Sequence, residues 1–556
     1  MAKKVFYDDD ARRRVLAGAQ VLYDAVKTTM GPKGRNVIIS KSYGHPTVTH
    51  DGVTVAKSVE VEEKYDEKEK IDTLGYKVGA ELIKQAATKM NDVAGDGTTS
   101  VTVLTYHLLE EANRLITAKH DPMELSRAVA EAGEYLIKEL DGMKKDIGKN
   151  KEKIAQVATI SAGDSGIGKL IADVIEKVGK DGVVTVEEGQ GLALESEVVE
   201  GFTFDRGFVS PYMVTDTSRM EAVYDKPAIV ITDKKISSIQ EFLPLLEKLA
   251  QAGKKDLVLI AEDVDGEALG TLILNRLKGV FNTIAIKAPA FGDRRKDVLN
   301  DIAILTGAEV ITDDRGMSFE NVELDVVGTA RKIIVTKDET TIIEGGGSVS
   351  EVKARIAQIN TQTKAATSEY DKENLEKRRA ALEGKVAVIK VGGATETEIE
   401  EKKFRVDDAV HAVKAALAEG IVAGGAVTFL DLSKRIKEKE GVSTHHAGWA
   451  LVKEALKQPF VQLMGNAGVK AIDSKMEEIL GSTKDGQGFD VNYPDAPIKD
   501  LIGEGVIDPA RVTREVIRNA ISIAGTSMTM GALVVEVPEP KPAAAADPGM
   551  GGMGMM

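Results

Sequence analysis

Four apolar residues near the start of the chain recur at intervals of three and four: Val15, Ala19, Leu22 and Val26. They follow an acidic run that begins at Asp8, and this combination predicts a helix with one buried face. The helix is expected to stop at residues 31–32, because glycine and proline do not continue helices. Two short strands are expected after it, at residues 37–39 and 47–49.

A segment rich in Lys and Glu predicts a second long helix, from Tyr65 to about Lys89. Another helix follows, and helical spacing continues to about Lys180. The first of these later helices is expected to bury four apolar residues: Val101, Leu104, Leu108 and Leu115. Residues 163–170 nearly fit the phosphate-loop spacing, but Leu170 replaces the required hydroxyl. We interpret them as a turn between helices.

From about Gly182 the pattern changes to short strands that alternate with helices, which predicts an α/β unit. The expected strands lie at residues 183–186, 228–232, 257–261, 283–287 and 309–312. Helices 239–250 and 267–277 carry more apolar residues than one buried face needs. The sequence leaves two interpretations open: both helices are buried, or they present an apolar groove that binds other chains.

The next segment, residues 348–382, is polar throughout and predicts a solvated helical hairpin or short coiled coil. A strand at 386–391 and a helix that ends at about Gly420 follow, and the remainder is expected to be mostly helical to about Ile523. One helix there is expected to begin with residues 508–509 in its first turn. Beyond Val537 the chain is rich in Pro and Ala, then in Gly and Met, which is typical of a flexible tail.

Composition narrows the function classes. The 556 residues are 43% hydrophobic and 29% charged, which is typical of a soluble protein of about three domains. The net charge of -15 argues against nucleic acid as the main partner. Without cysteine the chain has no disulfides, thiolate metal site or cysteine nucleophile, which suits the cytoplasm. Neither a secretory signal nor a membrane-spanning run is expected.

The candidate chemistry lies in three glycine-rich turns. Residues 91–100 combine two glycines, Asp96 and three hydroxyls before a helix, a pattern that suits phosphate and Mg²⁺ but also an ordinary helix cap. Residues 28–36, the first such turn along the chain, also carry cations, and an Asp-Gly step at Asp51 follows them; residues 91–100 are the second turn. A third turn, residues 419–425, comes shortly after Asp408.

Taken together these motifs resemble the group I chaperonins, the GroEL type, over essentially the whole chain. The shared motifs are residues 29–36 (TMGPKGRN), 51–53 (DGV), 95–99 (GDGTT), 204–207 (FDRG), 291–296 (FGDRRK), 424–425 (GG) and the Gly-Met tail. The resemblance implies an α/β multidomain subunit with nested domains. An equatorial ATP-binding domain would comprise 1–142 and 419–556, with a flexible tail at 537–556. A small intermediate hinge domain would comprise 143–199 and 387–418, and an α/β apical domain 200–386.

The resemblance also implies roles for single residues. Asp51 and Asp408 would orient the attacking water, and Asp96 would ligate Mg²⁺, with K⁺ as a possible second ion. The remaining ATP contacts would be Thr29, Met30, Gly31, Pro32, Gly95, Gly97, Thr98, Thr99, Ser100, Gly425, Asp490 and Asp508. Asn492 competes with Asp490 for its role, because the surrounding region has extra residues. Closure of the hinge that carries Asp408 would complete the site after ATP binds.

The implied activity is ATP-dependent folding of other proteins inside a homo-oligomeric ring of seven or fourteen subunits. Non-native proteins and a GroES-type co-chaperonin would bind the apical residues Phe208, Tyr212, Leu243, Leu246, Leu269, Ile273 and Leu274. The alternative is a ring scaffold or surface adhesin of the same fold that does not hydrolyse ATP. Retention of Asp51, Asp96 and Asp408 argues against that alternative.

Several positions depart from the family pattern. An insertion lies near residues 66–78, Ala418 replaces an acid, and Met213 replaces an aromatic residue in the apical segment. Many members place a base and an acid where this chain has Val461 and Lys470, so an ion pair between rings is missing. The departure predicts single rings, or double rings that separate readily.

Overall fold

The computed structural model describes residues 3–40, 46–66, 71–180, 182–189, 191–217, 219–366, 368–437 and 443–538. The chain forms two compact units, and one is inserted into the sequence of the other. Unit 1 comprises Met1–Asp173 and Gly393–Met556, and unit 2 comprises Val174–Gly392. The finer division into equatorial, intermediate and apical domains stays a prediction.

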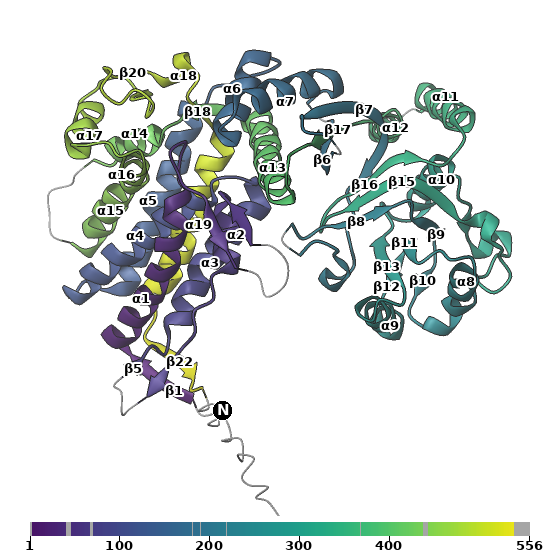
Figure 1. The fold of residues 1–556 in the computed structure, drawn as a ribbon, viewed down its shortest axis with the longest axis horizontal. Coiled ribbons are helices and arrows are strands. Elements are labelled where there is room, and N and C mark those ends of the chain that lie inside the picture. The colour runs from purple at the N-terminus through teal and green to yellow at the C-terminus, as the bar shows by residue number, and fades with distance from the viewer. Residues whose placement is uncertain are drawn as a thin grey trace, which may run out of the picture. The chain divides into compact units, whose positions relative to one another are not determined.

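Unit 1 is built around long helices that lie side by side in Figure 1. They are α1 (Asp8–Val26), α3 (Tyr76–Ala94), α4 (Thr98–Thr117), α5 (Pro122–Met143) and α19 (Ala510–Met528). Each turns one apolar face inward, and the predicted residues Val15, Leu22, Leu104 and Leu108 are buried there. The predicted end of α1 is confirmed, because it passes into a single 3-10 turn, Lys27–Thr29, just before Gly31.

Shorter elements complete unit 1. The helices are α2 (Gly52–Ser58), α6 (Lys151–Ala162), α13 (Glu396–Glu419), α14 (Val427–Arg435), α15 (Thr444–Ala455), α16 (Gln458–Asn466), α17 (Ile472–Leu480) and α18 (Leu501–Glu504). The antiparallel strand pairs are β2 (Val37–Ile39) with β3 (Thr47–Thr49), β18 (Ile421–Ala423) with β21 (Ile507–Pro509), and β19 (Gln487–Gly488) with β20 (Lys499–Asp500). Helix α7 (Ser165–Val178) extends from unit 1 into unit 2, and the Gly163 turn before it is the predicted link between helices.

The prediction of a helix from Tyr65 was wrong. Strands β4 (Tyr65–Asp66) and β5 (Ile71–Asp72) form an antiparallel pair, and α3 begins only at Tyr76. The physical reason is tertiary, because the Arg14 guanidinium binds both oxygens of Asp72, at 2.9 and 3.1 Å, and holds this segment against α1. The rest of the insertion, residues 67–70, lies outside the described residues.

The two ends of unit 1 also differ from the sequence prediction. Strand β1 (Lys3–Tyr7) pairs antiparallel with β22 (Ala532–Glu536), and neither strand was predicted. A two-stranded pair between the chain ends has no local signal, because its partner is more than 500 residues away. Helix α19 starts at Ala510 with Pro509 as its N-cap, so Asp508 belongs to strand β21 and not to the first helical turn.

Unit 2 is organised by a ten-stranded sheet whose main path runs β13-β11-β9-β15-β16-β7-β17-β6. The predicted strands are present as β6 (Val183–Glu188), β9 (Ala228–Thr232), β11 (Asp256–Ala261), β13 (Asn282–Lys287), β14 (Val310–Ile311) and β17 (Lys385–Val391). Four further strands were missed: β7 (Glu195–Phe204), β8 (Ala222–Asp225), β15 (Gly328–Val335) and β16 (Thr340–Gly345). A second, two-stranded sheet joins β10 (Lys235–Ile236) to β12 (Asp263–Val264).

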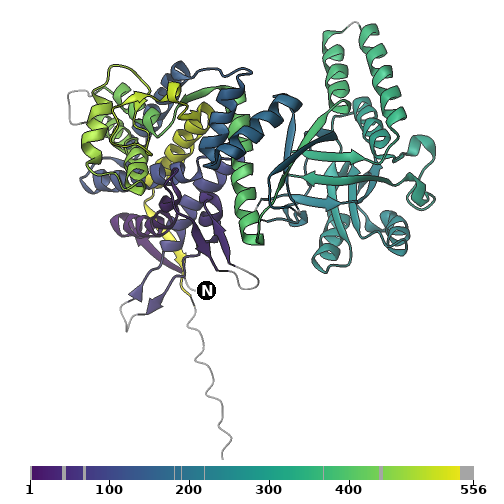
Figure 2. The same ribbon diagram turned by 45° about the horizontal axis from the view of Figure 1, so that its top comes forward.

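Helices α8 (Ile239–Gln251), α9 (Gly266–Leu277) and α10 (Asp293–Thr306) accompany this sheet. The predicted helical hairpin is confirmed as α11 (Val349–Ala365) and α12 (Glu369–Leu382), the paired green helices of unit 2 in Figure 2. Its base is fixed by the buried Asp301 of α10, which accepts hydrogen bonds from Arg355 at 2.7 Å and Arg378 at 2.7 and 3.1 Å.

Candidate functional site

Two of the predicted turns meet in unit 1 through a pair of threonine hydroxyls. Thr29 Oγ1 lies 2.8 Å from Thr99 Oγ1. Gly52 fits into the same place, because a Cβ atom there would lie 2.5 Å from Thr99 Oγ1 and 2.8 Å from Thr98 Oγ1. Residues from the first turn, the Asp-Gly step and the start of α4 are therefore in direct contact.

The first turn is shaped by a left-handed glycine. Gly31 has a φ of +80°, a backbone conformation that favours glycine. A Cβ atom there would also lie 2.1 Å from Leu463 Cδ1 of α16, so there is no space for a side chain. The turn closes through two backbone bonds, from Gly34 N–H to Gly31 O at 2.9 Å and from Arg35 N–H to Thr28 O at 2.8 Å. Pro32 follows within it, and Met30 is buried beneath.

The N-terminus of α4 has no side-chain cap. Its N-cap is Gly97, which adopts a left-handed conformation and makes no capping bond, so the N–H groups of the first helical turn have no intrahelical acceptor. These N–H groups, the positive end of the helix dipole and the hydroxyls of Thr98, Thr99 and Ser100 suit an anion such as a phosphate. The sequence alternative of an ordinary capped loop is not what the structure shows at this helix.

Asp51 sits at the N-terminus of the neighbouring helix α2. Its Oδ1 accepts from Val53 N–H at 3.0 Å, and its Oδ2 accepts from Thr54 N–H at 2.9 Å and from the Thr54 hydroxyl at 2.6 Å. These bonds fix the carboxylate in one orientation and identify it as the N-cap of α2. A carboxylate has about four acceptor positions, so a capping role leaves room for one more donor.

Two further carboxylates, both partly buried, lie near this point. Burial raises the pKa of Asp96, and the charge of the neighbouring Asp51 raises it further. The Gly97 N–H and the Ser161 hydroxyl oppose this shift, because they favour the charged form. Burial and the charge of Asp96 together raise the pKa of Asp508 to about 7. Carboxyl groups that repel one another in a buried site are stabilised by a bound cation, so the electrostatics fit Mg²⁺ at Asp96.

Helix α13 supplies the edge that carries Asp408. His411, one turn later, touches the second turn, because a Cβ atom on Gly95 would lie 2.2 Å from His411 Nδ1. Burial lowers the pKa of the His50 imidazole, and the nearby charge of Arg405, one turn earlier on α13, lowers it further. Residues three apart share a helix face, so Asp408 lies on the face of α13 that borders His50 and Gly95.

The third glycine turn adjoins Asp508. Strand β21 pairs Asp508 with Val422, and a Cβ atom on Gly424 would lie 3.1 Å from Asp508 Oδ1. Gly425 continues this turn in a left-handed conformation. Asp490 is placed differently: its Oδ1 accepts from Asn492 N–H at 2.9 Å, and the hydrogen bonds found among the described residues do not join it to Asp96 or Asp508.

Two neighbours of this site were missed from the sequence. His50 precedes Asp51, bonds to the backbone of Gly31, and places Cε1 2.7 Å from where a Cβ atom on Gly34 would be. Its position beside the Asp-Gly step was a usable signal. Ser161 of α6 lies beside Asp96, but nothing in its local sequence marks it.

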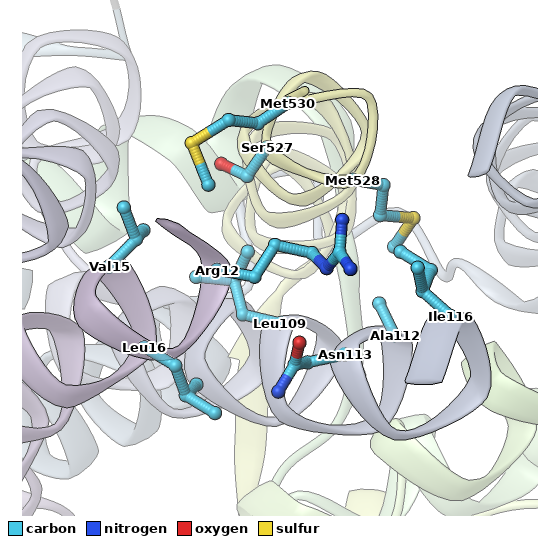
Figure 3. Close-up of a pocket in the computed structure, with 10 residues that line it drawn as sticks. All are labelled: Arg12, Val15, Leu16, Leu109, Ala112, Asn113, Ile116, Ser527, Met528 and Met530. Atoms are coloured by element: carbon cyan, nitrogen blue, oxygen red, sulfur yellow. The ribbon is translucent and has the colours of Figure 1, made fainter. Parts of the chain in front are cut away.

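Within the described part of the chain, no three His, Cys, Asp or Glu side chains are grouped closely enough to hold a metal ion by themselves. A metal at Asp96 would therefore take most of its ligands from phosphate oxygens and water, as Mg²⁺ commonly does. A separate pocket lies among α1, α4 and the end of α19, and Figure 3 shows Arg12 and Asn113 pointing into its largely apolar lining. It begins at Leu109, roughly 15 Å along α4 from Thr99 at 1.5 Å per residue, so it is not this site.

Unit 2 carries the predicted apolar surface in part. Leu243 of α8 is 37% exposed and Leu274 of α9 is 50% exposed. Tyr212, which directly precedes Met213, is exposed as well. Leu269 and Ile273 are partly buried. Phe208 and Leu246 are buried in the core of unit 2, together with Phe242, Leu245 and Leu249. Burial therefore explains most of the apolar excess in α8, while α9 leaves Leu274 and Leu277 exposed.

Comparison with known families decides the identity of the chain. Residues 22–538 match the model of the TCP-1/cpn60 chaperonin family. The chain belongs to this chaperonin family. Membership accounts for the mixed helical and α/β construction, supports a chaperone role, and implies client proteins and ring oligomers. Members of the family are typically ATPases. Among the described residues, no helix is both long and apolar enough to cross a membrane.

Proposed function

We propose that this chaperonin is of the group I, GroEL type, and that it uses ATP hydrolysis to fold other proteins. The observation that carries the proposal is the meeting of Thr29, Gly52 and Thr99 at the uncapped start of α4, beside partly buried carboxylates. Phosphoryl transfer needs positioned donors and charge neutralisation more than covalent help. The arrangement supplies the donors, and Mg²⁺ held by Asp96 would supply the charge neutralisation.

Each residue has a defined part in this proposal. The first-turn N–H groups of α4, including that of Thr99, and the hydroxyls of Thr98 and Ser100 donate to phosphate oxygens, while the Thr99 hydroxyl donates to Thr29. Gly31 and Pro32 line the nucleotide. Asp96 holds Mg²⁺, whose charge offsets that of the phosphates when it is bound, and K⁺ is a possible second ion. Gly425 and Asp508 contact the base and ribose, with Asp490 as a further candidate.

Asp51 and Asp408 are the proposed water-orienting pair. The capping bonds to Val53 and Thr54 hold the Asp51 carboxylate still, which is what a group that positions an attacking water requires. Asp408 comes from α13, whose adjacent turns lie beside His50 and Gly95. Two carboxylates on separate helices orient one water more firmly than either group alone.

The exposed apolar residues of unit 2 are the proposed site for clients. Leu243 and Leu274 lie on neighbouring helices and, with Tyr212, provide a patch for non-native chains, which expose similar surface. A GroES-type co-chaperonin would bind the same patch and release the client into a closed chamber. The ring would contain seven or fourteen subunits.

A refolding assay tests this proposal. The protein is mixed with a chemically denatured client, and client aggregation is followed by light scattering with and without Mg–ATP and a GroES-type co-chaperonin. We expect suppressed aggregation without nucleotide and recovery of client activity once ATP and co-chaperonin are added. A non-hydrolysing scaffold or adhesin predicts a result that does not change with ATP, and that outcome would reject the proposal.

A further inference from the structure

Helix α16 is bonded to the first glycine turn through its last residue. The Asn466 side-chain amide donates to Lys27 O at 2.9 Å and to Met30 O at 3.0 Å. Those two carbonyls bracket the 3-10 turn that leads into Gly31. The turn's own bond across the same residues, from Met30 N–H to Lys27 O, is longer at 3.3 Å. Asn466 therefore supplies the shorter contacts at this point.

The orientation of the Asn466 amide is fixed by the residue one turn earlier. Gln462 Nε2 donates to Asn466 Oδ1 at 2.7 Å. A backbone carbonyl accepts only, so the amide nitrogen of Asn466 must face Lys27 and Met30, and its oxygen must face Gln462. Gln462 is held in turn, because its Oε1 accepts from the Tyr23 hydroxyl at 3.2 Å.

Tyr23 is a rigid origin for this chain of hydrogen bonds. Its ring stacks on Tyr106 of α4 with centroids 4.2 Å apart and planes 7° from parallel. Burial raises the pKa of Tyr23 to about 12, so the phenol keeps the proton that it donates. Its oxygen also lies 3.2 Å from His107 Nε2, and His107 Nδ1 lies 3.1 Å from Glu110.

We propose that Asn466 is the positioning residue for the phosphate-binding turn, and that Gln462 and Tyr23 hold it in place. The inference rests on the proposed function, because it assigns this turn to ATP. The chain of donors runs one way, from Tyr23 through Gln462 and Asn466 to the Lys27 and Met30 carbonyls. It joins α1 and α16 to the turn, and packing of Leu463 on Gly31 brings the same helix against it.

The test compares Mg–ATP affinity, by calorimetry on the assembled protein, among three variants. Asn466→Asp keeps the size of the side chain but turns an acceptor toward two carbonyls, and we expect affinity to fall about tenfold or more, because small displacements at such sites have large effects. Tyr23→Phe removes one hydroxyl and should weaken binding about fivefold, the effect of one lost hydrogen bond. The double variant should match Asn466→Asp alone, because Tyr23 acts through Asn466.

Asn374→Asp is the matched control. Asn374 also donates from its amide to a backbone carbonyl, Tyr370 O at 2.7 Å, but on an exposed helix of unit 2, and its substitution should leave ATP affinity unchanged. A merely structural role predicts lower melting temperatures with normal affinity and KM in every folded variant, and additive effects in the double variant.

The outcomes separate the inference from the proposed function. If the wild-type ring binds Mg–ATP but Asn466→Asp and Tyr23→Phe both bind it as well as wild type, the positioning role is wrong and the ATPase proposal stands. If Asn466→Asp does not fold, normal affinity in Tyr23→Phe is enough to overturn the inference. If the wild-type ring does not bind Mg–ATP, the proposed function itself fails.

Discussion

Thr29 Oγ1 and Thr99 Oγ1 lie 2.8 Å apart, although 70 residues separate them in sequence. The Thr29 hydroxyl also donates its one proton to Val26 O at 2.9 Å. In the pair with Thr99 it is therefore the acceptor, and the Thr99 hydroxyl is the donor. The hydroxyl pair thus joins the end of α1 to the start of α4. It is the direct link between two of the three glycine turns.

This link predicts the effect of valine at either position. Both valine variants keep the side-chain shape. Thr99→Val removes the shared bond and Thr29→Val removes it together with the bond to Val26 O, so they should lower the free energy of unfolding by about 1 and about 2 kcal/mol, and both should weaken Mg–ATP binding. Thr361→Val is the control, because the Thr361 hydroxyl bonds to Ala357 O within its own exposed helix of unit 2. Calorimetric titration with ATP measures the difference, and unchanged affinity in both site variants would remove the link from the account.

The sequence predicted the helices and turns of this site, but not the contacts between them. Strong helical spacing placed α1, α4 and α13 correctly, and the glycine turns stood out because few residues tolerate such backbone. The contact of Gly52 with Thr99, or of Gly95 with His411, depends on helix packing between distant segments, which periodicity does not encode. The family resemblance, not the spacing, implied that the turns converge.

The failures have the same origin. The segment from Tyr65 has helical composition, but Tyr65–Asp66 pairs with Ile71–Asp72 as strands, and an ion pair from Asp72 to Arg14 holds the second strand against α1. Strand β1 pairs with β22, although nearly the whole sequence separates the two strands. In unit 2, the spacing of α8 could not show that Leu246 turns inward while Leu243 stays exposed, because both positions are equally apolar.

That difference in α8 makes a matched pair of variants. Leu243→Ser should weaken capture of a denatured client with little change in stability, because the side chain is 37% exposed. Leu246→Ser should instead lower the free energy of unfolding by about 2–5 kcal/mol, as large truncations in a core do. Thermal unfolding and a client-binding assay on both variants decide this. A large loss of stability in Leu243→Ser with normal capture would contradict the client-site assignment.

The carboxyl of Asp508 predicts a pH dependence in the nucleotide-free protein. Its pKa of about 7 is above the ordinary value of 3.8, so the folded state binds a proton that the unfolded state releases between about pH 4 and 7. Stability from this group is therefore present at low pH and is lost as pH rises through 7, by at most about 4 kcal/mol at 1.36 kcal/mol per pKa unit.

Asp508→Asn removes this penalty. The gain in stability over wild type should be larger at pH 8 than at pH 5, measured by denaturant unfolding without nucleotide. Asp495→Asn, at an exposed position of the same region, is the control. A gain that is the same at both pH values would show that Asp508 is not held in its protonated form.

The positions Val461 and Lys470 predict weak contact between rings. Val461 is partly buried and Lys470 is exposed in the single subunit, and the opposite charges expected there from the family pattern are missing. One exposed ion pair contributes only about 0–1 kcal/mol, but ring symmetry repeats it. We expect single seven-membered rings, or double rings that separate with ATP or salt. Native mass spectrometry tests this, and a fourteen-subunit mass that persists through both treatments would contradict it.

Substituting Asp51 and Asp96 separates positioning of water from binding of metal. Asp96→Ala should lose Mg²⁺-dependent ATP binding, because the proposed metal ligand is gone. Asp51→Asn should keep most binding, because the amide oxygen can still cap α2, and should lose turnover. Binding by calorimetry with and without Mg²⁺ distinguishes the two. Normal Mg²⁺-dependent binding in Asp96→Ala would place the metal elsewhere.

The most direct test of the site is phosphate release by Asp408→Ala compared with wild type, at saturating Mg–ATP, with ATP affinity measured on the same preparations. We predict that wild type hydrolyses ATP, that Asp408→Ala binds ATP nearly as well, and that its turnover falls at least about a hundredfold, as expected for loss of a group that acts in the transition state. Glu396→Gln, at an exposed position in the first turn of the same helix, should behave as wild type. Equal loss of ATP binding and turnover in Asp408→Ala, or no hydrolysis by the wild-type ring, would contradict the account.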